Sequence, residues 1–126
     1  MRTEIITRRD DLEIRRAVLA PGEATPWHID AVHRFTVVVR GERLAIEFRD
    51  GERIELAVAP GQADWDPPEP RPHRAVNVGA ETFEEVVTFF LDPPGCEPQP
   101  ERPSGQLVSA PATAPAAPSR STRRAG

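Results

Sequence analysis

Three histidines are the residues of this sequence best suited to metal chemistry, and two of them lie close together around a carboxylate. His28 and Asp30 are two residues apart, so on an extended strand both side chains point to the same face. His33 follows three residues later, and His73 precedes another short apolar run far along the chain. Two imidazoles and one carboxylate with open positions suit Fe(II), and the same ligands hold Mn, Ni or Zn. The sequence therefore predicts a divalent transition-metal site at His28, Asp30 and His73, with His33 as a further ligand if its turn folds inward.

Arg34 is a candidate for binding a substrate carboxylate. Its guanidinium would repel a bound cation, but its planar fork matches a carboxylate group. Other catalytic residues remain unknown, because the sixteen basic residues are all arginine and the chain has no tyrosine. Schiff-base chemistry on lysine and acid or base chemistry on tyrosine are thereby excluded. The single cysteine, Cys96, has no predicted base beside it and is not expected to act as a nucleophile.

Short extended segments must position these side chains. Residues 35–39, FTVVV, need a pleated and largely buried setting, so the histidine-rich segment leads directly into a core strand. In residues 11–19, Leu12, Ile14 and Val18 share one parity and predict a half-buried strand. The Pro-rich residues 67–72 are expected to form a stiff loop that no central strand could contain. The complete set of expected strands is 3–7, 11–19, 27–30, 34–39, 43–48, 54–58, 64–66, 73–78 and 83–91.

These segments indicate an all-β fold. No stretch of ten or more residues has a 3.6-residue apolar period, and turn signals such as Asp50-Gly51 separate the strands regularly. The pattern predicts a double-stranded β-helix, or jelly-roll, barrel. The 126 residues suffice for one domain, expected over residues 1–94. Residues 95–126 contain no aromatic residue and predict a disordered tail that is dispensable for folding.

Charge and composition restrict the partners. The tail carries four arginines and two glutamates, a net charge of +2. Because the whole chain has a net charge of −4, residues 1–94 carry a net charge of −6. An acidic body argues against a nucleic-acid partner, which would need a clustered basic face. No apolar run is long enough for a signal peptide or a membrane span. We therefore expect a cytoplasmic protein that binds a small molecule, with no membrane partner.

The first half of the chain resembles a known family motif. Gly22, five residues, His28, then Asp30 and later Gly41 resemble the first cupin motif, which reads G, five residues, H-x-H, three or four residues, E, six residues, G. Asp30 stands where that motif has its second histidine. Arg34 stands where it has the glutamate, or Phe35 under the longer spacing.

The second half resembles the second cupin motif, G-x5-P-x-G-x2-H-x3-N. Gly61 is followed after five residues by Pro67, and His73 is followed three residues on by Asn77. Glu69 replaces the internal glycine, and one extra residue precedes His73. The resemblance covers residues 15–91 and is closest to small single-domain cupins of the RmlC-like type. We expect Asn77 to bond to the nearby backbone rather than to take part in chemistry.

The resemblance implies a fold and a range of functions. His28 and His73 would be metal ligands, and Asp30 would be one by its position. The chain would be a small metal-binding cupin that acts on or binds a small polar or acidic metabolite, as a dioxygenase or an isomerase. The alternative is a non-catalytic ligand-binding module that has lost its metal, which the missing glutamate favours. Family likeness and the exposed edges of a small β domain also predict a homodimer, with residues 3–7 crossing between subunits.

A second likeness is weaker. An H-x-D pair followed by a distant histidine also resembles the iron site of 2-oxoglutarate oxygenases, which share the rolled double-sheet architecture. Those enzymes hold their co-substrate with an arginine shortly after the last histidine. No arginine lies between Arg74 and Arg102, which argues against this assignment.

Overall fold

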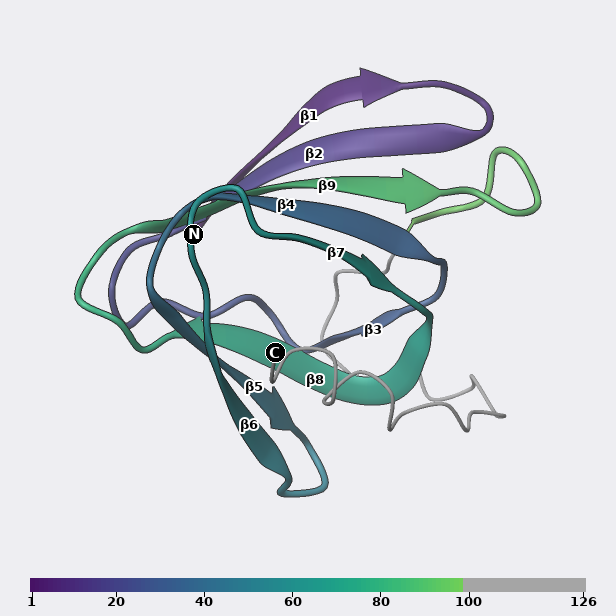
Figure 1. Cartoon of the computed structure of the whole chain (residues 1–126). Coiled ribbons are helices and arrows are strands. Elements are labelled where there is room, and N and C mark those ends of the chain that lie inside the picture. The colour runs from purple at the N-terminus through teal and green to yellow at the C-terminus, as the bar shows by residue number, and fades with distance from the viewer. Residues whose placement is uncertain (99–126) are drawn as a thin grey trace.

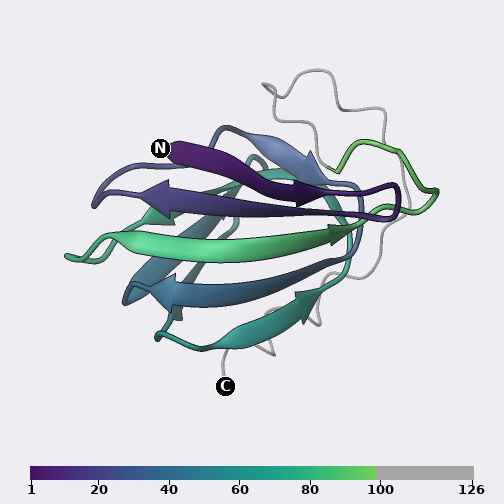
Figure 2. The same cartoon turned by 90° about the horizontal axis from the view of Figure 1, so that it is seen from above.

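Two antiparallel sheets face each other and enclose the core (Figure 1). The computed structural model describes residues 1–98. One sheet has the strand order β1-β2-β9-β4-β7, which Figure 2 shows side by side, and the other has the order β3-β8-β5-β6. This arrangement confirms the all-β, double-stranded β-helix fold. The strands are β1 (Arg2–Arg8), β2 (Leu12–Leu19), β3 (His28–Asp30), β4 (Arg34–Arg40), β5 (Arg43–Phe48), β6 (Arg53–Ala57), β7 (Ala63–Asp66), β8 (Glu69–Asn77) and β9 (Phe83–Phe90).

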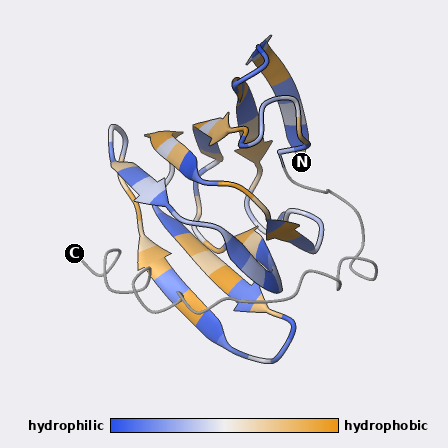
Figure 3. Cartoon of the chain, turned by 90° about the vertical axis from the view of Figure 1, so that its right-hand side faces the viewer, coloured by the Kyte–Doolittle hydropathy of each residue, from blue (hydrophilic) through white to orange (hydrophobic). Residues whose placement is uncertain are grey.

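The larger of two hydrophobic core clusters lies between the sheets. Its buried residues come from strands of both sheets and from the turn after β6, and they are Leu19, Val38, Leu44, Leu56, Val58 and Phe83. Figure 3 shows hydrophobic and hydrophilic residues alternating along the strands, as expected when one face of a strand is buried. The described residues contain no helix that is long and apolar enough to cross a membrane.

Tight turns hold the strands in register. The β5–β6 hairpin closes at Asp50-Gly51, as its sequence predicts, and pairs Arg43 with Ala57 and Glu47 with Arg53. Asn77 bonds to backbone groups as expected, since its side-chain nitrogen donates to the carbonyls of Leu19 and Glu81. Asn77 of the second motif therefore supports the fold.

Strand β2 faces the core with the parity opposite to the one its apolar residues indicate. Glu13 is fully buried and Arg15 lines the interior, whereas the apolar Ile14 lies on the other face. The buried carboxylate is compensated by Arg8 Nη1 at 2.9 Å and by Arg15 Nε at 2.5 Å. Because two guanidinium groups neutralise Glu13, the sheet can turn this charged face inward.

The expectation that residues 67–72 form a loop is wrong from Glu69 onward. Strand β8 begins at Glu69 and includes Pro70 and Pro72, although it lies between β3 and β5. Its pairing with β5 reaches only to His73 opposite Phe48. Beyond that point the Pro72 carbonyl accepts one hydrogen bond from the Arg49 amide. Because the β5 ladder has ended there, the N–H groups that prolines lack are not required for strand pairing. The proline segment is thus an edge on this side.

The first residues of the expected tail contact the barrel. The Gly95 amide donates to the Asp10 carbonyl at 2.7 Å, and Cys96 packs against a second core cluster. That cluster consists of Val32, Val87, Phe89 and Leu91. The rest of the expected tail, residues 99–126, lies outside the described residues, so its predicted disorder stays a prediction.

Candidate metal centre

Two neighbouring strands bring the candidate ligands together. His28 on β3 pairs directly with His73 on β8 in the antiparallel ladder, and Asp30 pairs with Glu69. One ligand atom from each of His28, Asp30 and His73 lies within 4.8 Å of the other two, and all three residues are buried. The register of β3 against β8 therefore supplies the contact between the two halves of the site that the sequence only suggests.

Backbone carbonyls fix both imidazole rings in the same way. His28 Nδ1 donates to the Pro26 carbonyl, and His73 Nδ1 donates to the Arg71 carbonyl, each at 2.7 Å. A neutral imidazole protonated at Nδ1 keeps its lone pair on Nε2. Both Nε2 atoms point toward Asp30, at 3.5 Å for His28 and 2.8 Å for His73. Two lone pairs therefore converge on a carboxylate, an arrangement that a proton or a metal ion stabilises.

Arg34 provides a permanent positive charge at this carboxylate. Its Nη1 atom lies 3.2 Å from Asp30 Oδ2, the same oxygen that His73 approaches. Burial alone would raise the pKa of Asp30, but the charges of Arg34 and the two histidines outweigh it and hold that pKa well below its usual range. Burial lowers the pKa of His28, although the nearby Asp30 carboxylate opposes this shift. Asp30 is thus ionised and His28 favours the neutral form, as metal ligation requires.

The geometry fits a metal ion held through Asp30 Oδ1. Within residues 1–98 this oxygen is buried and has no hydrogen-bond partner, in contrast to Oδ2. Metal–ligand distances of about 2.1 Å place neighbouring ligand atoms about 3.0 to 3.4 Å apart. The distance of 3.5 Å from His28 Nε2 to Asp30 Oδ1 is close to this range. The buried group of His28, Asp30 and His73, whose ligand atoms lie within 4.8 Å of one another, could therefore bind a metal ion.

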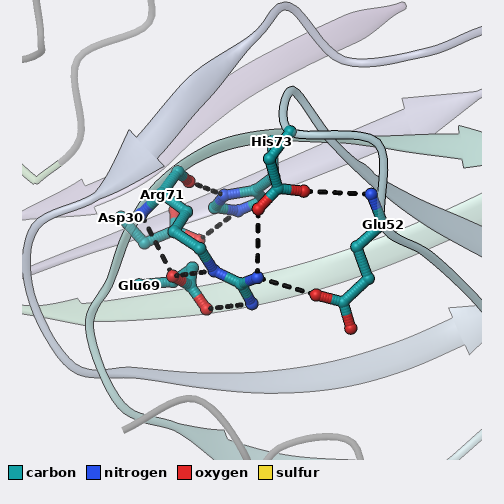
Figure 4. A network of polar contacts seen from close by, with 6 residues as sticks. Asp30, Glu52, Glu69, Arg71 and His73 are labelled. Carbon is teal, nitrogen blue, oxygen red and sulfur yellow. Dashed lines mark hydrogen bonds and ion pairs between the residues drawn. The ribbon is translucent and has the colours of Figure 1, made fainter. Parts of the chain in front are cut away.

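The start of β8 is held rigid by an ionic network around Arg71 (Figure 4). Its guanidinium bonds to Glu69 and to Glu52, and it lies over the Phe48 ring at 3.8 Å. The Phe48 ring in turn contacts the His73 ring, with centroids 5.6 Å apart. Because the Arg71 carbonyl orients His73, these contacts support the position of one ligand.

His33 does not join the other ligands. It is exposed, and its Nδ1 atom lies 3.2 Å from Trp65 Nε1 on the outside of the barrel. Trp65 is 50% exposed and stacks on Phe90, so it forms part of the surface. The guanidinium groups of Arg49 and Arg74 both lie over the Trp27 ring, each 4.6 Å from its centroid.

A cavity of about 150 Å³ opens beside the candidate ligands and extends into the apolar core. Arg34 lines this cavity, together with charged residues that the motif reading did not identify: Arg15, Asp64, Asp66 and Glu85. The parity of β7 could have indicated two of them, because Asp64 and Asp66 are two residues apart on one strand. Asp66 also pairs with Arg34 in the β4–β7 ladder.

Comparison with known proteins places the chain among barrels of this type. A family model described as a cupin domain matches residues 15–89. A cupin domain from Bordetella pertussis Tohama I is 17% identical, with 71% of this chain and 91% of that chain covered and a TM-score of 0.64. An RmlC-like cupin family protein with a double-stranded β-helix fold from Methanocaldococcus jannaschii is 19% identical, with 72% and 80% covered and a TM-score of 0.59.

One similar structure was solved with a small acid bound. Oxalate oxidase in complex with the substrate analogue glycolate is 26% identical to this chain, with a TM-score of 0.52. The match covers 68% of this chain and 44% of that chain. No curated protein matches this sequence.

Proposed function

Because this chain belongs to the cupin family, we propose that it is a small metal-binding cupin that acts on or binds a small polar or acidic metabolite. His28, Asp30 and His73 hold one divalent ion, which is Fe, Mn, Ni or Zn. As an enzyme, it acts as a dioxygenase or an isomerase. The observation that carries the proposal is the convergence of both Nε2 atoms on the carboxylate of a buried, ionised Asp30, with His28 nearest Oδ1 and His73 nearest Oδ2.

Arg34 gives the proposal its preference for acidic ligands. It lines the cavity beside the ligand group, and its fork geometry suits a carboxylate. The glycolate complex of oxalate oxidase supports this class of ligand, since that protein binds a small carboxylate in a related fold. A cavity of about 150 Å³ has room for a ligand of about six non-hydrogen atoms, the size of benzene.

The roles of the chain's own residues follow from their positions. The carbonyls of Pro26 and Arg71 keep the two imidazoles in the tautomer that can coordinate, and Arg34 orients the carboxylate. The apolar residues deeper in the cavity exclude water from the other end of the ligand. A bound metal would supply Lewis-acid chemistry or a place to hold O2 beside the ligand.

The second candidate function is a ligand-binding module without metal. The contact between Arg34 Nη1 and Asp30 Oδ2 favours it, because the guanidinium already compensates the carboxylate as a cation would. In this module the cavity binds a small molecule through hydrogen bonds from Arg34 and the histidines. Fold alone cannot separate the two functions, since one barrel supports many activities.

Metal analysis of the purified protein tests the choice. The protein is expressed with Fe, Mn, Ni and Zn supplied in turn, and its metal content is measured by mass spectrometry. About one ion per chain is expected in the wild type, and Asp30→Ala should lose it. His33→Ala is the matched control, because His33 lies on the outer surface. A wild type that carries no metal and shows no thermal shift with any of the four ions would support the module without metal.

A further inference from the structure

Three buried side-chain atoms lack a hydrogen-bond partner within residues 1–98, and they belong to Glu13, Asp30 and Arg34. The atoms on Asp30 and Arg34 are of interest here. Asp30 Oδ1 is an acceptor and Arg34 Nε is a donor, and both residues line the same cavity. Buried polar groups are seldom left unpaired, because the loss of water is then not compensated. The unpaired Oδ1 atom of Asp30 would be satisfied by a cation, and the unpaired Nε–H group of Arg34 would be satisfied by an acceptor such as an anion.

The charge of the cavity decides how these two ligands influence each other. The charged side chains that line it in the described part of the chain are Arg15, Arg34, Asp30, Asp64, Asp66 and Glu85. Met1 also lines it, and its terminal ammonium is already paired with Glu23. Two arginines and four carboxylates give a formal charge of −2, which repels an anion that enters alone. One divalent cation cancels this charge, so an anion becomes acceptable only after the metal has bound.

Arg34 couples the two sites directly. Its Nη1 atom shares Asp30 with the metal position, so a bound cation and the guanidinium repel each other across one carboxylate. Asp66 lies opposite Arg34 in the β4–β7 ladder and Phe89 lies opposite it in the β4–β9 ladder, so only the β7 neighbour of this pair carries a charge. An anion on Arg34 Nε would offset the repulsion and would also be attracted by the metal. Each ligand therefore favours the other.

We propose that the cavity binds a divalent cation and a small carboxylate cooperatively, with Arg34 Nε donating to the carboxylate. This inference rests on the proposed metal site at His28, Asp30 and His73. By thermodynamic linkage, the carboxylate raises the metal affinity by the same factor by which the metal raises the carboxylate affinity. The metal binds less tightly alone than with the acidic ligand present, because Arg34 opposes a cation at Asp30.

The wild-type protein provides the first test. Binding of Mn²⁺ is followed at about pH 8 through the electron paramagnetic resonance signal of the free ion, with sodium acetate as the carboxylate probe. Acetamide, a neutral molecule of nearly the same shape, is the matched control, and sodium chloride keeps the ionic strength equal. Acetate should lower the Kd for Mn²⁺ by at least about tenfold after correction for its effect in protein-free buffer. Acetamide should leave the Kd unchanged.

Variants of the two cavity arginines provide the second test. Arg34→Gln should bind Mn²⁺ more tightly than the wild type in the absence of acetate and should lose the acetate effect. Arg34→Lys keeps the charge and should retain part of the effect. Arg15→Gln removes the same charge from the same cavity but not from Asp30, so it should keep the acetate effect. Thermal unfolding checks that each variant is folded, and the wild-type comparison stands if an Arg34 variant is not.

The outcomes separate this inference from the proposed function. If Mn²⁺ binds the wild type equally well with acetate and with acetamide, the coupling is overturned and the metal site remains. The coupling is also overturned if Arg15→Gln abolishes the acetate effect as fully as Arg34→Gln, because the effect would then come from general charge. If Mn²⁺, Fe²⁺, Ni²⁺ and Zn²⁺ all fail to bind under every condition, the proposed metal site itself is wrong.

Discussion

The substitution Asp30→Asn tests whether the carboxylate at the centre of the site stabilises the metal-free fold through Arg34. Asparagine keeps the size of the side chain and removes its charge. The Asp30 side chain is 1% exposed, the Arg34 side chain is 15% exposed, and Asp30 Oδ2 lies 3.2 Å from Arg34 Nη1. The variant therefore leaves a largely buried guanidinium without the counter-charge that lies 3.2 Å from Nη1.

The expected loss of stability follows from these distances. Two unit charges 3.2 Å apart attract each other by about 5 kcal/mol at an effective dielectric constant of about 20. Removing one partner of a buried pair costs about 3 to 5 kcal/mol. We expect the lower value, about 3 kcal/mol, because asparagine can donate to His73 Nε2 and Asp66 still faces Arg34. For a domain of this size the thermal midpoint should fall by at least about 12 °C.

Urea unfolding in the presence of a chelator at about pH 8 measures this loss. The same substitution is then made in an Arg34→Gln background, where no guanidinium remains to be paired. In that background Asp30→Asn should lower the free energy of unfolding by less than about 1 kcal/mol. Equal losses in the two backgrounds would refute the reasoning, because they would show that Asp30 acts independently of Arg34.

Three other predictions concern the ligands, the edge strand and a turn. His28→Ala should abolish stoichiometric metal binding, whereas His33→Ala should retain it. Metal affinity should also fall as the pH is lowered, most steeply below about pH 6.5, because a protonated imidazole cannot coordinate and burial lowers the pKa of His28. The protein should scatter light as a homodimer through β1, an edge strand on which Ile5 is 55% exposed, and a mass of about 14 kDa at micromolar concentration would contradict this. Gly41→Ala should lower the free energy of unfolding by about 1 to 3 kcal/mol in a denaturant titration, because Gly41 has φ +136° and a Cβ there would lie 2.7 Å from Phe83 Cδ1. An unchanged free energy of unfolding would contradict this prediction.

The strand pattern of the chain could be predicted from local features. Period-two alternation and turn signals are properties of neighbouring residues, so they identified the β5–β6 hairpin and an all-β fold without tertiary information. Which parity of a strand faces inward depends on what lies opposite. The burial of Glu13 became acceptable only because Arg8 and Arg15 approach it. The prolines of β8 became acceptable only because β5 ends at Phe48.

The same division applies to the candidate site. The spacing of His28 and Asp30, and the motif position of His73, were enough to indicate which residues could bind a metal. The sequence by itself could not exclude His33, because the direction of a turn depends on long-range packing. Only the pairing of β3 with β8 brought the ligands within 4.8 Å of each other. Only the packing of the two sheets placed Arg34 on Asp30, since a contact between two charges depends on distance in space and not on separation in the chain.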